Sequence, residues 1–248
     1  MSSSRFPGKP LAKICQIPMV GHVYFRSKMS KTLEQVFVAT CDKEIQQYCF
    51  DNKMDVVMTK DTHERASDRT AEAMLKIEQS TKEKADIVVM IQGDEPMLNP
   101  QMIDLAVEPM LHDEHISVVN LMSKLKTQAE CENPNEVKVV VDNNHFALYF
   151  SREPIPSRKK SAKDVPMYKQ VCIIPFRRGF LLKFNELAPT SLENIESVDM
   201  LRVLEHGYKI KMVMSDYDTY SVDTPQDLVK VEKLMKGSEL LTKYAGMG

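Results

Sequence analysis

The sequence lacks the features that mark several broad classes of protein. Its charges nearly cancel, with 33 Lys and Arg against 35 Asp and Glu, so no overall basic field argues for a nucleic-acid partner. No apolar run approaches the ~20 residues of a membrane span, and the N-terminus lacks the apolar core of a signal peptide. We therefore expect a cytoplasmic protein that acts on a small molecule and binds neither nucleic acid nor membrane.

Cysteine is scarce and scattered, and none of it is in C-x-x-C spacing. The five cysteines are Cys15, Cys41, Cys49, Cys131 and Cys172. An odd number without metal-ligand spacing predicts reduced thiols, and it argues against a disulfide framework or a zinc site.

Strand-like and helix-like segments alternate along the first half of the chain. The short apolar runs are 36–40, 56–59 and 87–91, and the segments with helical spacing are 42–52 and 67–80. Ser67 is a candidate N-cap for the second helix, and the uniformly apolar run 87–91 predicts a fully buried strand. This alternation favours an α/β fold with a mostly parallel central sheet, in one domain over 248 residues rather than two small ones.

The pattern changes in the second half. After an apolar run at 116–119, the runs 137–141 and 145–150 flank Asp142-Asn143-Asn144, which is hairpin chemistry. We expect an inserted antiparallel hairpin within about 130–180. The last predicted elements are a strand at 209–214 and a helix to about Lys236, with Thr224 as its cap and Pro225 as its first residue.

Asp94 follows the apolar run 87–91 within the sequence QGDEP. It therefore lies at the carboxyl end of the sheet, where ligands of open α/β folds bind. A carboxylate there is a candidate Mg²⁺ ligand, because hard cations prefer oxygen. The alternative is that Asp94 only caps the turn before Pro96.

Asp223 supplies a second carboxylate, just ahead of the helix that begins at Pro225. Acidic residues near a helix start are favoured by the helix dipole, so alone this residue argues weakly for a metal site. The first residues add fixed cations, because Arg5 and Lys9 stand in a loop stiffened by Pro7 and Pro10. Paired carboxylates and fixed cations are what nucleoside triphosphate chemistry needs.

Two other arginines are candidate ligand contacts with structural alternatives. Arg69 could reach a ligand or remain a solvated charge in the first turn of its helix. Arg152, in the proline-stiffened segment SREPIP, could bind a ligand or form a structural ion pair.

These motifs, in this order, resemble the 3-deoxy-manno-octulosonate cytidylyltransferases, or CMP-Kdo synthetases. The matching segments are SSSRFPGKPL, VFVAT, QGDEPM, NPNEVKVVVD, ALYFSREPIP, LENIE, LRVLEHG and SVDTPQDL. The resemblance implies a three-layer nucleotidyltransferase fold of the glycosyltransferase-A type in a homodimeric enzyme. That enzyme would transfer CMP from CTP to a Kdo-like 2-keto-3-deoxy sugar acid, with Mg²⁺ as cofactor, for lipopolysaccharide or capsule-type precursors.

The resemblance also implies roles for individual residues. Lys9 would grip the CTP triphosphate with Arg5 beside it, and Asp94 and Asp223 would hold Mg²⁺. The further residues implied to bind substrate are Ser67, Arg69, Gln92, Arg152, Gln170 and Asp199.

The sequence departs from the family pattern at three places. The family begins with a strand that ends in Pro-Ala-Arg, and this sequence starts just after that point, so a first strand is expected to be missing. The family's Ser-Gly-Thr-Asp/Glu-Arg stretch is replaced by 65–69. On the sugar side, a histidine, a tyrosine and a glutamine are replaced by Gln170, Ile174 and Met200. Because polar partners discriminate strongly between ligands, these changes leave two alternatives open: another sugar acid, of sialic or amino type, or a non-catalytic relative.

Overall fold

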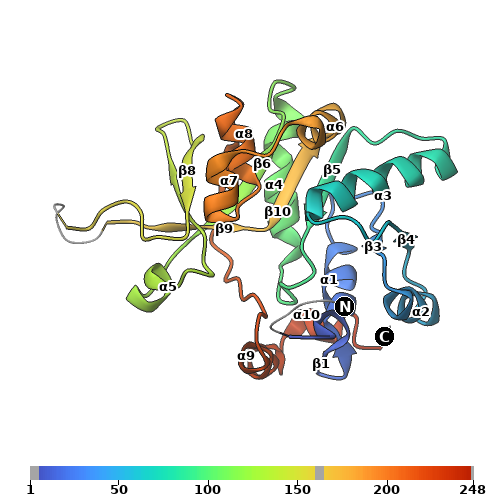
Figure 1. Ribbon diagram of the computed structural model, residues 1–248. Coiled ribbons are helices and arrows are strands. Elements are labelled where there is room, and N and C mark those ends of the chain that lie inside the picture. Colours follow the sequence, from blue (N-terminus) through green and yellow to red (C-terminus); the bar gives the residue numbers. More distant parts are fainter. Residues whose placement is uncertain (1–5, 160–164, 247–248) are drawn as a thin grey trace. The chain divides into compact units, whose positions relative to one another are not determined.

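The computed structural model describes residues 6–159 and 165–246, so Arg5 lies outside the described residues (Figure 1). Contacts between residues divide the chain into two compact units. The first unit comprises Met1–Lys84, Gln92–Asp104 and Thr219–Gly248, and the second comprises Ala85–Ile91 and Leu105–Asp218. No linker-like segment in the sequence marks this division, and one domain over the whole chain stays a prediction.

Helix α1 is fully buried in the first unit and shares core clusters with α2, α9 and α10. Its elements are η1 (Lys9–Leu11), β1 (Lys13–Ile14), β2 (Ile17–Pro18), α1 (Met19–Ser27), β3 (Val38–Thr40), α2 (Lys43–Asp51), β4 (Val56–Met58), α3 (Ala66–Thr81), α9 (Pro225–Met235) and α10 (Glu239–Thr242). Every residue of α1 is buried, and one core cluster joins it to α2 and to Tyr244, which follows α10. Strands β3 and β4 pair in parallel with α2 between them in the chain, which confirms the predicted strand–helix–strand order.

The second unit contains a five-stranded sheet in the order β11-β6-β9-β7-β8 and a separate antiparallel pair, β5 with β10. Its elements are β5 (Ile87–Ile91), most of α4 (Pro100–His112), β6 (Val119–Lys124), α5 (Gln128–Glu132), β7 (Lys138–Val141), β8 (Ala147–Ser151), β9 (Tyr168–Val171), β10 (Ile173–Arg177), α6 (Arg178–Glu186), α7 (Ser191–Glu196), α8 (Met200–Glu205) and β11 (Lys211–Ser215). Strands β11 and β6 are parallel, and the other pairs in the sheet are antiparallel.

The predicted hairpin is confirmed as β7 and β8. Asp142 Oδ1 accepts hydrogen bonds from the backbone amides of Asn144 and Phe146, both at 2.8 Å, which fixes the turn. His145 takes the left-handed conformation, with φ 59°. The register shifts between Val140 and Val141, where the strand bulges.

A buried ion pair ties α7 to α8 in the second unit. The guanidinium of Arg202 donates to both carboxylate oxygens of Glu193, at 2.7 and 2.8 Å, and the Arg202 and Glu193 side chains are 4% and 0% exposed. The same guanidinium lies over the ring of Phe184. Because both charges are desolvated, each depends on the other for its stability in the core.

Two details of the predicted elements are wrong, the N-cap of α3 and the full burial of β5. Helix α3 begins at Ala66 with Arg65 as its cap, so Ser67 lies inside the first turn and is not the N-cap. Strand β5 is only partly buried apart from Met90, because it pairs with a single described strand, β10, and does not sit inside a broad sheet. Of the apolar run 116–119, only Val119 belongs to a named strand, β6. The stiff N-terminal loop ends in a turn of 3₁₀ helix, η1.

Candidate active site

Lys9 begins the short helix η1, and the turn before it is held by a glycine. Gly8 has φ 73°, a conformation that glycine adopts without the steric cost of a side chain. The amide of Lys9 donates to Phe6 O at 3.2 Å and that of Leu11 donates to Gly8 O at 2.9 Å. The Lys9 side chain is 14% exposed, so this turn presents its ammonium group from a partly buried, ordered position.

Asp94 lies in the turn that follows β5 in the chain. Its carbonyl accepts a hydrogen bond from the amide of Val222 at 2.9 Å, which joins it to the segment just before Asp223. The amide of Leu98 donates to Glu95 O at 3.0 Å and closes the turn. These backbone bonds bring Asp94 next to the start of α9.

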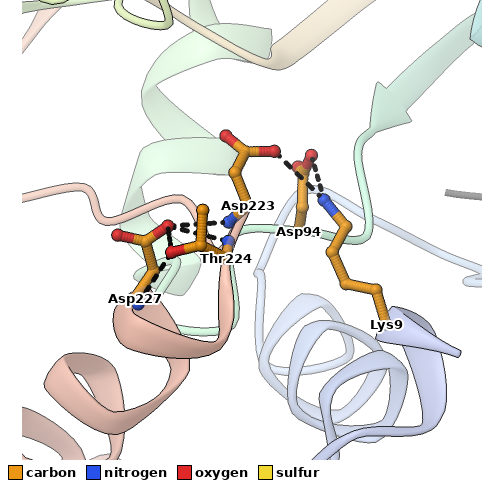
Figure 2. A network of polar contacts seen from close by, with 5 residues as sticks. All are labelled: Lys9, Asp94, Asp223, Thr224 and Asp227. Atoms are coloured by element: carbon orange, nitrogen blue, oxygen red, sulfur yellow. Dashed lines mark hydrogen bonds and ion pairs between the residues drawn. The ribbon is translucent and has the colours of Figure 1, made fainter. Parts of the chain in front are cut away.

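Asp223 is positioned by the capping box of α9, whose cap is Thr224, as the sequence predicts. Thr224 Oγ1 accepts from the amide of Asp227 at 3.2 Å, and Asp227 Oδ2 accepts from the amide of Thr224 at 2.9 Å. Asp227 Oδ2 also accepts from the amide of Asp223 at 3.2 Å (Figure 2). Asp227 was not among the predicted site residues, although the T-x-x-D spacing of a capping box is visible in the sequence.

Both carboxylates contact one ammonium group. Lys9 Nζ lies 3.3 Å from Asp94 Oδ2 and 3.4 Å from Asp223 Oδ1, and Figure 2 shows the two side chains meeting at Lys9. The Asp94 and Asp223 side chains are 26% and 22% exposed, so water reaches the cluster but does not surround it. The structure therefore brings together the lysine predicted to grip the triphosphate and the two aspartates predicted to hold Mg²⁺.

The donor set fits a magnesium ion that is shared with a substrate. Among residues 6–159 and 165–246, no group of three or more His, Cys, Asp or Glu side chains could hold a metal alone. Two adjacent carboxylates suffice for Mg²⁺, which usually takes one or two from the protein and the rest of its ligands from water and substrate phosphates. The neighbouring Lys9 adds a positive charge for those phosphates.

Three other residues predicted to bind substrate belong to the first unit. Arg69 lies on α3, where its guanidinium contacts Thr59 Oγ1 and Lys60 O, and Ser67 is fully buried in the same turn. Gln92 is partly buried, two residues before Asp94. Their roles in binding stay predictions.

Arg152 and Asp199 belong to the second unit. The guanidinium of Arg152 donates to three backbone carbonyls, those of Pro134, Glu196 and Ser197, at 2.8, 2.6 and 3.1 Å. This is a structural arrangement of the kind the sequence left open, although its partners are carbonyls rather than a carboxylate. Asp199 is the N-cap residue of α8.

Gln170 is the polar member of the expected sugar side. It is partly buried on β9, and its Nε2 donates to Asn120 Oδ1 at 2.6 Å. Ile174 and Met200 are 2% and 1% exposed and belong to the core of the second unit.

None of the described helices is both long and apolar enough to cross a membrane.

Comparison with known proteins gives consistent matches over most of the chain. A family model described as "Cytidylyltransferase" matches residues 1–210. The 3-deoxy-manno-octulosonate cytidylyltransferase of Geotalea uraniireducens is 40% identical over 247 residues, which cover 95% of each chain. That of Geobacter metallireducens is 42% identical over 246 residues, covering 95% of this chain and 94% of the relative.

Two solved structures resemble the fold. A CMP:2-keto-3-deoxy-manno-octonic acid synthetase complexed with CTP has a TM-score of 0.86 and 36% identity, covering 95% of this chain and 94% of the other. A putative glucose-1-phosphate thymidylyltransferase from Bacillus anthracis has a TM-score of 0.66 at 14% identity, covering 96% and 93%, and at that identity it shows the fold alone.

Proposed function

The chain belongs to the 3-deoxy-manno-octulosonate cytidylyltransferase family, and from this premise we propose that it transfers CMP from CTP to a Kdo-type sugar acid and releases pyrophosphate. The resemblance seen in the sequence is thus confirmed, as is the nucleotidyltransferase fold. The observation that carries the proposal is the meeting of Lys9, Asp94 and Asp223.

We propose that Asp94 and Asp223 hold Mg²⁺. When bound, this ion would polarise the α-phosphoryl group and favour ionisation of the attacking sugar hydroxyl. The backbone amide of Asp223 donates to the Asp227 carboxylate, which holds Asp223 in place. The backbone carbonyl of Asp94 accepts from the amide of Val222, which holds Asp94 beside it. Both carboxylates are thus placed before substrate arrives, which reduces the reorganisation needed in the reaction.

Lys9 would bind the triphosphate. Its ammonium group lies beside the two carboxylates, so it can donate to phosphate oxygens of a nucleotide whose metal ion those carboxylates share. There it would offset the negative charge that gathers on the leaving pyrophosphate. No covalent nucleophile is needed for this transfer, because the sugar hydroxyl attacks the α-phosphorus directly.

We propose that Gln170, on β9, contributes to the choice of sugar. Asn120 is fully buried and donates through Nδ2 to Val171 O at 2.7 Å, so its Oδ1 is turned to Gln170 Nε2. This orients the Gln170 amide with its oxygen as the end that can accept a sugar hydroxyl or amine. Because an amide oxygen accepts from either group, another sugar acid, of sialic or amino type, is the second candidate substrate.

We further propose a homodimer formed through the second unit. Leu148 on β8 and Ile195 on α7 are 61% and 75% exposed, although both are large and apolar. Glu196, next to Ile195, accepts from Ser151 Oγ on β8 at 2.8 Å, which keeps the two elements together. A second copy covering this surface would bury both side chains. Cytoplasmic location and a role in lipopolysaccharide or capsule precursors are also part of this proposal.

The experiment is pyrophosphate release with CTP and Mg²⁺ over Kdo, its 8-amino analogue and N-acetylneuraminate. We expect release with one of the two Kdo sugars, and loss of that release in Asp94→Asn and Asp223→Asn proteins with unchanged circular dichroism. Near-normal turnover in either variant would remove that aspartate from the metal site. Release with none of the sugars would contradict the proposed reaction.

A further inference from the structure

A chain of buried hydrogen bonds crosses the first unit and takes no direct part in the proposed chemistry. It is formed by His22, Arg26 and Tyr244, which are 0%, 2% and 2% exposed. Tyr244 Oη lies 2.8 Å from His22 Nδ1 and 2.9 Å from Arg26 Nε. His22 and Arg26 are four residues apart on α1, so they lie on one face of that helix and both reach the same hydroxyl.

The donor and the acceptor in each of these hydrogen bonds can be assigned. Nε2 of His22 lies 2.7 Å from Ile14 O, and a carbonyl only accepts, so Nε2 carries the proton. Burial lowers the pKa of His22 to about 4, so the ring is neutral near pH 7 and Nδ1 accepts. The Tyr244 hydroxyl must therefore donate to Nδ1 while its oxygen accepts from Arg26 Nε.

The two ends of this series of hydrogen bonds lie in the segments that carry the candidate catalytic residues. Ile14 belongs to β1, which follows Lys9 and η1 in the chain. At the other end, Arg26 Nη1 donates to Met97 O at 3.2 Å and to Leu98 O at 3.1 Å, in the turn that follows Asp94. One hydroxyl thus joins the segment of Lys9 to the segment of Asp94.

Stability alone does not account for this arrangement. The Arg26 guanidinium is buried among neutral acceptors, and within the described part of the chain its Nη2 has no hydrogen-bond partner. A buried cation without a carboxylate is costly, and apolar side chains of similar volume would fill the same space at less cost. These hydrogen bonds connect β1, at Ile14, to the turn at Met97 and Leu98.

We propose that Tyr244 is a positioning residue, whose hydroxyl holds the Lys9 and Asp94 segments at a fixed spacing through His22 and Arg26. The proposal rests on the proposed function for its catalytic consequence. Its structural content does not depend on which sugar is used.

Tyr244→Phe is the direct test, because it removes the hydroxyl and keeps the ring that stacks on Phe25. The matched control is Tyr24→Phe, on α1, the helix that carries His22 and Arg26. The Tyr24 ring is also buried, but its hydroxyl bonds to Asp55 rather than to either segment. Both variants remove the hydroxyl of a buried tyrosine, so a general loss of stability would appear in both.

Amide hydrogen exchange followed by mass spectrometry measures how often the backbone hydrogen bonds of each segment open. In Tyr244→Phe we expect about tenfold faster exchange in peptides covering Leu11 and Ala12 and in peptides covering Leu98, with no such change in Tyr24→Phe. We also expect kcat at saturating CTP to fall about tenfold in Tyr244→Phe alone, and Mn²⁺ binding without nucleotide to weaken. Exchange that is unchanged at either segment, or equally fast in both variants, would overturn the proposal.

The two proposals fail in different ways. If the wild-type protein releases pyrophosphate with none of the sugars while exchange responds as expected, the proposed reaction is wrong and the positioning role stands. If the wild-type protein is active and Tyr244→Phe matches Tyr24→Phe in exchange, Mn²⁺ binding and kcat, the positioning role is wrong and the reaction stands.

Discussion

Replacing Lys9 by Met should change the binding of nucleotide and of metal in opposite directions. The variant keeps the length of the side chain and removes the ammonium group that lies 3.3 Å from Asp94 Oδ2 and 3.4 Å from Asp223 Oδ1. A hydrogen bond to a charged group contributes about 1.5–3 kcal/mol, so losing one to the triphosphate should weaken CTP binding about 10- to 150-fold.

Metal binding should become tighter, because one positive charge beside the carboxylates is gone. Two unit charges 4 Å apart interact by about 4 kcal/mol at an effective dielectric constant of about 20. The three side chains are between 14% and 26% exposed, so solvent screens part of this energy. A quarter of that repulsion, about 1 kcal/mol, already gives about a fivefold gain in affinity for Mg²⁺ or Mn²⁺.

Calorimetry measures CTP affinity at fixed Mg²⁺, and electron paramagnetic resonance measures Mn²⁺ affinity without nucleotide. The matched control is Lys13→Met, an exposed lysine on β1 that should change neither affinity. Unchanged CTP affinity in Lys9→Met would refute the phosphate contact. Parallel weakening of CTP and Mn²⁺ would refute the electrostatic reasoning and would indicate a disturbed loop.

Three further predictions concern the surroundings of the site and the core. Glu193→Gln leaves the buried Arg202 without its carboxylate and should cost about 3–5 kcal/mol, seen as a fall in Tm of about 6–20 °C; a fall under 2 °C would contradict this. Thr224→Ala removes the cap of α9 and should cost about 1 kcal/mol in urea unfolding and raise the Mg²⁺ concentration for half-maximal turnover; unchanged Mg²⁺ dependence would separate the cap from Asp223. The pKa of His22 falls from 6.5 to about 4 on folding, so the unfolded chain binds more protons between these values. Stability should therefore drop as pH falls from about 6.5 to 4, and this part of the drop should be absent in His22→Asn.

Local patterns in the sequence were enough to predict most elements around the site. Alternating apolar runs predicted β3, α2 and β4, and the Asp142-Asn143-Asn144 turn predicted the β7–β8 hairpin. The sequence likewise predicted Thr224 as the N-cap of α9. These predictions rest on hydrophobic periodicity and on hydrogen bonds between residues a few positions apart. A short stretch of sequence therefore contains all the residues involved. The N-cap of α3 was misplaced because the observed cap, Arg65, makes no side-chain capping hydrogen bond, so its residue type does not mark the start of the helix.

The sequence by itself also determined which residue types are available for the chemistry: a lysine after a left-handed glycine, an aspartate after a strand and an aspartate before a helix. Only the tertiary structure decided that these three meet. Lys9 contacts Asp223 across a sequence separation of 214, and Tyr244 contacts His22 across 222. Such contacts arise when α1 is buried and the C-terminal segment packs against it, and the packing of distant segments leaves no periodic signal in the chain.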